Sequence, residues 1–207
     1  MTLSVVSILI ACLSLLLSAA TLWLTFLRRG TVRMTKPTFI AFFEAHRVDG
    51  PKIFLRALLY SSAKRGQILE SMFVRLRRGE SVQTFNVWAY GERELARGSG
   101  LFVGHEGLTC NHHFLLPKDG TQFHFLPGDY VLEIHAALVH RKPVALQQIR
   151  LHLSEEQAAA LKEKHVAMYF DWGPDAGSYH AHVNRKPPEP AIDDPNLLAL
   201  LHLPPGG

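Results

Sequence analysis

The segment Ser71–Tyr90, SMFVRLRRGESVQTFNVWAY, decides the fold class of this 207-residue chain. In its first half Met72, Val74 and Leu76 alternate with other residues at a period of two, which is the pattern of a half-buried β-strand. A short turn of Arg, Gly and Glu leads into a second run of β-forming residues, Val82–Tyr90. Two such runs joined by a tight turn predict an antiparallel β-hairpin.

Similar apolar runs recur about every ten residues along the chain, and turn-forming residues separate them. The Gly-rich and charged segment 91–100 is predicted to be a loop. Strands at this spacing, joined by hairpin-type connections, favour an antiparallel sandwich over a parallel α/β sheet. Further strands are predicted at 38–44, 52–60, 101–103, 108–116, 122–126, 130–139, 143–153, 166–172 and 178–183.

One helix is predicted in the soluble part of the chain. Ser154-Glu155-Glu156-Gln157 has the pattern of a capping box, in which the Ser side chain and the Gln side chain satisfy each other's backbone amides. Good helix formers continue from Ala158 to His165. The sequence therefore predicts a helix of about ten residues directly after a strand.

The segment Leu126–Ile134, LPGDYVLEI, resembles the Pro-Gly-x-Tyr-x-Leu-x-Val segment of bacterial immunoglobulin-like domains. The resemblance implies that Tyr130 is buried and opens a late strand of the core. The paired cysteines and intervening tryptophan of antibody-type domains have no counterpart in this sequence. We therefore expect a mainly β chain with an antiparallel immunoglobulin-like β-sandwich, a fold class that hosts many unrelated functions.

A transmembrane helix is predicted at the N-terminus, because Leu3–Leu27 is a run of twenty-five residues without a charge. A helix needs about 20 apolar residues to cross the hydrocarbon layer. We divide the chain into a transmembrane anchor at 1–30, a β-sandwich domain at 31–186 and a flexible Pro-rich tail at 187–207.

The charges beside the apolar run predict its orientation. Met1 and Thr2 carry no basic side chain, whereas the C-terminal flank is basic. The positive-inside rule then places the sandwich in the cytoplasm behind a single-pass inner or plasma membrane span. A periplasmic or extracellular domain is the alternative. A cleaved signal peptide is disfavoured, because it would need its basic residues before the apolar run and here they follow it. The residues predicted to lie at the membrane surface are Arg28, Arg29, Arg33 and Lys36.

Small and hydroxylated residues recur in the apolar run at spacings of three and four, and we call this row the small-residue seam. In lipid, helices associate through close packing of small residues and through interhelical hydrogen bonds. The seam therefore predicts contact with a transmembrane partner or a second copy of the chain. The alternative is that its hydroxyls bond back to their own helix. The seam consists of Ser4, Ser7, Ala11, Ser14, Ser18, Thr21 and Thr25.

Charge is distributed unevenly along the chain. Residues 28–100 hold 14 Lys and Arg against 6 Asp and Glu, while residues 101–207 hold 8 against 12. The basic half lies next to the predicted span, where each well-placed cation gains about 1 kcal/mol from an anionic membrane surface. We therefore expect the domain to lie near the bilayer. No nucleic-acid recognition motif accompanies these charges, so no nucleic-acid partner is predicted.

Histidine is abundant, with 12 residues in 207. His180 and His182 project from one face of a predicted strand, and Asp171 lies across the preceding turn. His113, or its neighbour His112, is a further candidate ligand. These residue types suit a transition metal, so a metal site is one hypothesis. The alternative is that these are ordinary surface histidines on strands.

No catalytic or cofactor motif is present in the sequence. Cys110 beside His112 is the nearest approach to a thiol–imidazole pair, and a buried structural cysteine is the alternative. The aromatic cluster Tyr169, Phe170, Trp172 and Tyr179 is typical of core packing. Its loop, 171–179, is the best surface candidate for recognition.

The tail contains an acidic cap followed by a leucine cluster, Asp193–Leu203. Such a segment suits a short amphipathic helix that docks into a partner's groove. Folding back onto its own domain is the alternative.

The sequence as a whole favours a membrane-anchored adaptor or accessory protein whose sandwich makes protein–protein contacts at the membrane surface. A His-rich metal-binding or redox module is the alternative, and a hydrolase is a weaker one. Apart from that metal, no cofactor is predicted, and the leading hypothesis needs no enzymatic activity.

Overall fold

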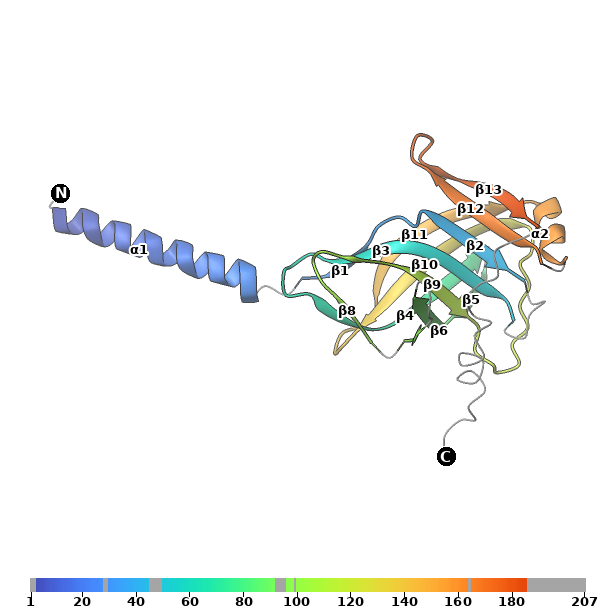
Figure 1. Ribbon diagram of the computed structural model, residues 1–207, viewed down its shortest axis with the longest axis horizontal. Coiled ribbons are helices and arrows are strands. Elements are labelled where there is room, and N and C mark those ends of the chain that lie inside the picture. The colour runs from blue at the N-terminus through green and yellow to red at the C-terminus, as the bar shows by residue number, and fades with distance from the viewer. Residues whose placement is uncertain are drawn as a thin grey trace, which may run out of the picture.

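The fold is described from a computed structural model, which describes residues 3–27, 30–44, 50–91, 96–98, 100–163 and 165–185. The chain begins with a long apolar helix and continues into two antiparallel β-sheets (Figure 1). The predicted fold class, a mainly β chain with antiparallel sheets and one short additional helix, is confirmed. The described strands run from Val32 to Asn184, within the predicted domain.

The N-terminal helix comprises α1 (Leu3–Leu22) and a π-helical turn, η1 (Trp23–Leu27). Together they form one span of 25 residues with no residue buried in the protein, long and apolar enough to cross a membrane. At about 1.5 Å per residue the span measures roughly 37 Å, against about 30 Å for the hydrocarbon core.

The larger sheet contains eight strands, seven of which form a continuous path. The eighth, β1 (Val32–Met34), pairs with β3. The path runs in the order β13 (Ser178–Asn184), β12 (Ala167–Gly173), β2 (Phe39–Phe43), β3 (Lys52–Ser61), β9 (Leu108–Leu115), β6 (Val87–Gly91) and β7 (Ala96–Arg97).

The smaller sheet contains five strands, four of which form its path. The fifth, β8 (Leu101–Val103), pairs with β4. The path runs in the order β11 (Val144–Leu153), β10 (Gly128–Leu138), β4 (Gln67–Arg78) and β5 (Ser81–Phe85).

The core lies between the two sheets and follows the period-two alternation of their strands. On β10, Leu132 and Ile134 are fully buried, while the residues between them are half-exposed. Phe42 on β2 stacks on Phe125 with ring centroids 4.6 Å apart, and it meets Phe170 edge-on at 5.0 Å. Burial of these rings together with the more numerous aliphatic side chains of the core stabilises the sandwich.

The predicted hairpin exists, but its second strand is shorter than expected. β4 and β5 pair from Val74 opposite Phe85 to Arg78 opposite Ser81. The prediction of one strand over Val82–Tyr90 is wrong, because β5 belongs to the smaller sheet and β6 to the larger one. Both halves consist of β-forming residues, so the sequence pattern continues across the point at which the chain changes sheets.

The predicted strand at 122–126 is also wrong. Phe125 is buried, but its backbone amide donates to Glu44 Oε2 at 3.3 Å instead of to a neighbouring strand. Glu44 also contacts His124 Nδ1, so one buried carboxylate holds this irregular segment in place. Two short strands, β1 and β7, were not predicted, since two or three residues carry too little periodicity.

The helix α2 (Glu155–Leu161) begins where the capping box predicts. Gln157 N donates to Ser154 Oγ, and Ser154 N donates to Gln157 Oε1. The helix ends earlier than predicted, and His165 adopts a left-handed conformation with φ of 59°. That conformation is incompatible with a helix that continues through His165.

Replacing Phe42 with Ala should lower the free energy of unfolding by about 3–5 kcal/mol, because the ring is fully buried between the sheets. Urea unfolding of the full chain in detergent, followed by tryptophan fluorescence, measures the change. The matched control is Phe102→Ala, since that ring is 63% exposed and its loss should cost less than about 1 kcal/mol. Equal losses for the two variants would contradict the proposed core.

Candidate functional site

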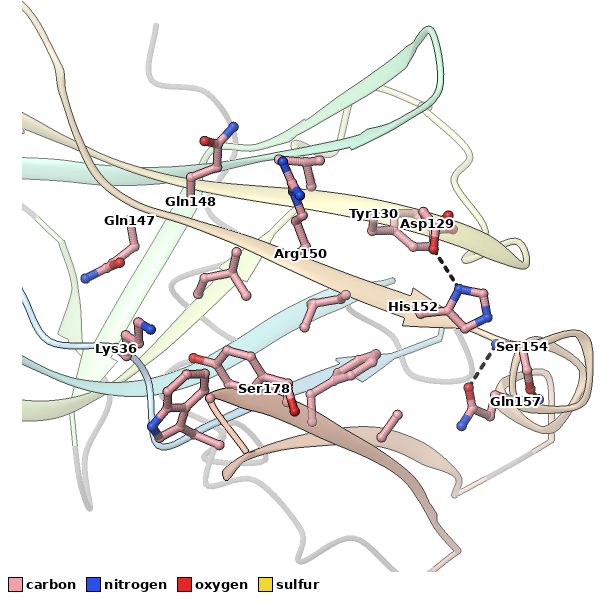
Figure 2. A pocket seen from close by; sticks show the side chains of 18 residues that line it. Lys36, Asp129, Tyr130, Gln147, Gln148, Arg150, His152, Ser154, Gln157 and Ser178 are labelled. Carbon is pink, nitrogen blue, oxygen red and sulfur yellow. Dashed lines mark hydrogen bonds and ion pairs between the residues drawn. The ribbon is translucent and has the colours of Figure 1, made fainter. Parts of the chain in front are cut away.

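A groove of about 760 Å³ opens between strand β11 of the smaller sheet and strands β12 and β13 of the larger sheet (Figure 2). Its floor is apolar and includes Ile149, Leu151 and Phe170 from the core. Polar side chains line the rest, among them Lys36, Gln147, Gln148, Arg150, His152 and Ser178. A groove of this volume is within the range of ligand sites in proteins.

The groove is bordered by strands that have an unpaired edge. In the described residues β11 pairs only with β10, and β13 pairs only with β12. An edge strand presents backbone N–H and C=O groups that can pair with an added chain. The groove therefore combines an apolar floor with free backbone hydrogen-bonding groups.

One wall of the groove is formed by two aromatic side chains. The rings of Trp172 and Tyr179 lie 5.1 Å apart, and Lys36 Nζ lies 4.1 Å from the centre of the Trp172 ring. Tyr179 donates its hydroxyl hydrogen bond to the carbonyl of Pro37 at 2.9 Å. Burial raises the pKa of Tyr179 well above its ordinary value, so this hydroxyl remains a donor at physiological pH. These contacts hold the wall in place without a ligand.

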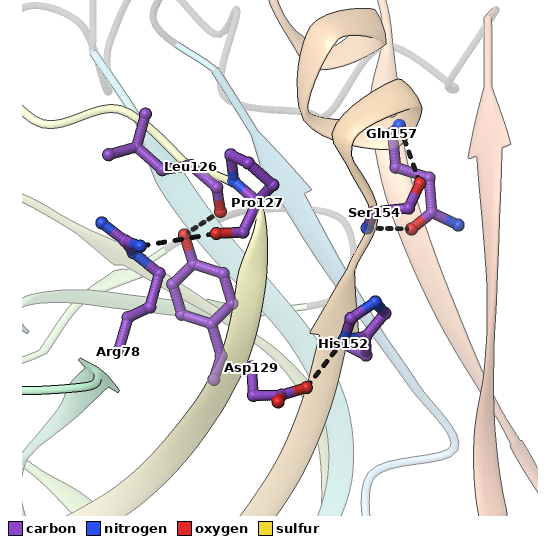
Figure 3. Close-up of polar contacts among 8 residues, drawn as sticks. Arg78, Leu126, Pro127, Asp129, His152, Ser154 and Gln157 are labelled. Carbon is purple, nitrogen blue, oxygen red and sulfur yellow. Dashed lines mark hydrogen bonds and ion pairs between the residues drawn. The ribbon is translucent and has the colours of Figure 1, made fainter.

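An ion pair lies at the other end of the groove. Asp129 Oδ1 contacts His152 Nδ1 at 2.7 Å, and both side chains are exposed (Figure 3). Ser154, two residues on, uses its hydroxyl to cap α2. Within the described residues no hydroxyl hydrogen-bonds to the second ring nitrogen of His152. The Asp–His pair therefore lacks the aligned nucleophile that a hydrolase of the Ser-His-Asp type requires.

Tyr130 contributes to the same part of the groove and fulfils the expectation drawn from the Leu126–Ile134 segment. It is 2% exposed, and its hydroxyl donates to the carbonyl of Leu126. Arg78 Nη1 donates to the neighbouring carbonyl of Pro127 at 3.4 Å (Figure 3). These bonds fix the turn from which β10 begins.

The four predicted metal ligands do not form one cluster. Asp171 Oδ2 lies 3.3 Å from His182 Nδ1, and His180 is opposite Asp171 in the strand register. His113 lies on β9, four strand positions from β13, or roughly 19 Å at about 4.8 Å per strand. In the described part of the chain, no group of three or more His, Cys, Asp and Glu side chains is placed to hold a metal ion. The sequence could not predict this separation, because the order of strands in the sheet is not visible in a spacing pattern.

Cys110 and His112 are close together but lie in the core. The sulfur is 3.4 Å from His112 Nε2, and Trp88 Nε1 donates to His112 Nδ1 at 3.3 Å. Burial lowers the pKa of His112 to about 4, so the ring is neutral at pH 7 with its proton on Nε2, facing the sulfur. A neutral, enclosed imidazole does not generate the thiolate that nucleophilic catalysis requires. The alternative of a buried structural cysteine is therefore the one that the structure supports.

The predicted aromatic cluster divides among three environments. Phe170 is buried in the core, whereas Trp172 and Tyr179 form the groove wall. Tyr169 lies on the opposite face of the larger sheet, 5.8 Å from the Phe39 ring. The predicted recognition loop 171–179 thus contributes to the groove, together with β11. Alternation of polar and apolar residues on β11 was visible in the sequence, but its position at a sheet edge was not.

Of the remaining predicted residues, Lys36 lines the groove, whereas the described residues of α1 and β1 do not. Ser7, Ser14 and Thr21 donate their hydroxyl hydrogen bonds to carbonyls four residues earlier in α1, at 2.8–3.0 Å. Thr25 lies in the π-helical turn, which changes its position relative to an α-helical seam. Arg33 is exposed on β1. Arg28, Arg29 and the tail from residue 187 onward fall outside the described residues.

Comparison with protein-family models, with curated proteins and with solved structures finds no match for this chain.

The buried histidines predict a loss of stability in acid. The folded pKa of His112, about 4, is below the ordinary value of 6.5, so the unfolded chain binds the proton first and stability falls as pH decreases from 6.5 to 4. The loss from this group alone is on the order of 3 kcal/mol. His112→Gln should reduce, but not abolish, the dependence of unfolding free energy on pH, measured by urea unfolding at pH 7.0 and 4.5, because burial also lowers the pKa of His113 to about 3.

The control is Leu55→Ala, opposite His112 on β3, because it removes a fully buried side chain without removing a titratable group and should leave this pH dependence unchanged. An unchanged slope in His112→Gln would show that the buried ring does not titrate as described.

Proposed function

We propose that the chain is a membrane-anchored adaptor or accessory protein whose immunoglobulin-like sandwich binds a segment of a partner protein in the groove. The observation that carries the proposal is the groove itself, an apolar floor flanked by edge strands and an aromatic wall.

The groove suits an extended segment of polypeptide. A peptide that adds to a sheet edge gains main-chain hydrogen bonds, and its alternate side chains point toward the same face. On β11 the buried residues Ile149 and Leu151 provide the apolar surface for such side chains. Lys36 and Arg150 on the rim favour a partner segment that carries acidic residues.

The helical span Leu3–Leu27 is proposed to attach this binding module to the membrane. The basic residues after the span support a cytoplasmic position for the sandwich, and a periplasmic or extracellular position remains the alternative. Arg33 is exposed, which is required if it lies at an anionic membrane surface, whereas Lys36 lines the groove.

Photo-crosslinking tests the groove. With benzoylphenylalanine at Gln148 on β11, irradiation of native membranes should yield a discrete adduct with a partner protein. The matched position is Gln83 on β5, the opposite edge of the same sheet, where no such adduct is expected. Trp172→Ala should lower the adduct yield about tenfold or more, since aromatic anchors dominate binding energies.

Phe54→Ala removes a half-buried ring from the larger sheet and should leave the yield unchanged. Adducts that form equally at both positions, or that persist after Trp172→Ala, would remove the groove as the binding site.

The small-residue seam is tested separately by replacing Ser14 and Ser18 with Leu. The larger side chains prevent close approach of a second helix, so recovery of a transmembrane partner or second copy should fall about five- to thirtyfold, as for a loss of 1–2 kcal/mol. Co-purification of two differently tagged copies, and of membrane partners, measures the change. The control variants Leu9→Ile and Leu16→Ile alter the opposite helix face and should have no effect. Unchanged recovery after replacing Ser14 and Ser18 with Leu would mean that the seam is not a contact.

A further inference from the structure

The end of the sandwich next to the apolar span is joined firmly to the residues that leave the span. Thr31 N donates to Ser62 Oγ at 2.9 Å, and Ser62 N donates to the carbonyl of Thr31 at 3.0 Å. Thr31 is four residues beyond Leu27, so at most about 14 Å of chain separates them. Figure 1 shows β1 and β8 at this end of the sandwich. Any bilayer that holds the span is therefore close to this end.

Three large apolar side chains are exposed at the same end. Ile68 is 55% exposed, Phe102 is 63% exposed and Val139 is 40% exposed. Ile68 and Phe102 are directly opposite each other on β4 and β8, and Val139 N donates to the carbonyl of Ile68 at 3.5 Å. The three side chains thus form one exposed apolar group and not isolated residues.

Basic side chains surround this apolar group. A hollow of about 260 Å³ is lined by Ile68, Phe102 and Val139 together with Arg65 and Arg141. Exposed Lys64 and Lys142 are adjacent in sequence to the two arginines. Of the nearby carboxylates, Glu106 is paired with His105 at 2.9 Å, and Glu70 is exposed on β4. The surface therefore carries an excess of positive charge around an apolar centre, and we call these five lining residues the tip patch.

The position of Phe102 depends on a glycine. A Cβ atom added to Gly66 would lie 2.5 Å from Phe102 Cζ, and Gly66 has a positive φ of 67°. The turn between β3 and β4 therefore lets the tip of the ring approach the backbone at Gly66 while the side chain stays 63% exposed. An aromatic ring displayed in this way is suited to the boundary between lipid headgroups and acyl chains.

We infer that the tip patch is a second membrane contact, in which Ile68, Phe102 and Val139 enter the headgroup boundary of an anionic bilayer while Arg65 and Arg141 bind lipid phosphates. Apolar insertion and electrostatic attraction to anionic lipid reinforce each other in interfacial binding. Arginine binds phosphate through two parallel hydrogen bonds, which suits the two arginines to this role. The inference rests on the proposed membrane attachment through the span, and it adds the lipid chemistry that the sandwich itself recognises.

Quenching of tryptophan by brominated lipids tests the inference on the full chain in reconstituted vesicles. The probe is Phe102→Trp, and the matched control is Val82→Trp on β5, where the side chain is 52% exposed. Val82 is opposite Arg77, nine residues along β4 from Ile68, or roughly 30 Å away. Vesicles contain phosphatidylcholine alone or with phosphatidylglycerol. In anionic vesicles the added tryptophan at 102 should be quenched at least twofold more than the one at 82.

The charges are tested by adding Arg65→Glu and Arg141→Glu to the Phe102→Trp chain. Quenching at 102 should then fall to the level seen at 82, and added salt should lower it in the unsubstituted background. An unchanged urea midpoint shows that the double replacement leaves the fold intact.

The outcomes separate this inference from the proposed anchor. Trp23 lies in the span, so quenching of the unsubstituted chain reports insertion of the helix. If Trp23 is quenched but tryptophans at positions 102 and 82 are quenched equally, the tip patch is not a membrane contact, and the proposed anchor still stands. No quenching of Trp23 would overturn the anchor. Equal quenching at position 102 in neutral and anionic vesicles would show that anionic lipid is not the ligand. If a photo-crosslinker at position 102 captured only protein in native membranes, the patch would be a protein contact instead.

Discussion

Apolar packing between the two sheets is the constraint on which the rest of this structure depends. Each strand must place alternate side chains toward the opposite sheet, and the aromatic contact of Phe42 with Phe125 and Phe170 joins strands and irregular segments in one core. The candidate site uses the margin of this core. Phe170, Ile149 and Leu151 are buried on one side and border the groove on the other, so the binding surface and the stability of the fold share the same side chains.

Several buried polar groups have defined partners, which restricts what they can do chemically, whereas the buried His113 Nδ1 has no hydrogen-bond partner among the described residues. Trp88 donates to His112, which in turn faces Cys110, and Glu44 accepts from Phe125 and contacts His124. These contacts satisfy groups whose burial would otherwise be unfavourable. The abundant histidines therefore divide between the interior, as for His112, and exposed positions on strands, as for His152 and His182.

The sequence predicts local features that one segment specifies by itself. The alternation on β10, the capping box at Ser154 and the apolar N-terminal helix each depend on residues close together in the chain, and each was predicted correctly. Features that depend on distant segments were not predictable. The change of sheet at Asn86 leaves no trace in a continuous run of β-formers, and the separation of His113 from His182 follows from strand order. The groove was predicted only through Trp172 and Tyr179, because nothing in the sequence identifies β11 as an edge strand.

The hydrogen bonds between Thr31 and Ser62 also limit the distance over which the groove can operate. A long flexible linker would let a domain search a wide volume above a bilayer, whereas the three residues between Leu27 and Thr31 would keep it within a layer little thicker than the sandwich. In an anchored chain, the groove can bind a partner segment only if that segment lies within this short distance of the bilayer. A short tether of this kind raises the effective concentration of nearby membrane-associated partners and excludes those that stay in bulk solution. For the proposed membrane-anchored chain with a partner segment in the groove, the length of the connection would itself select among partners.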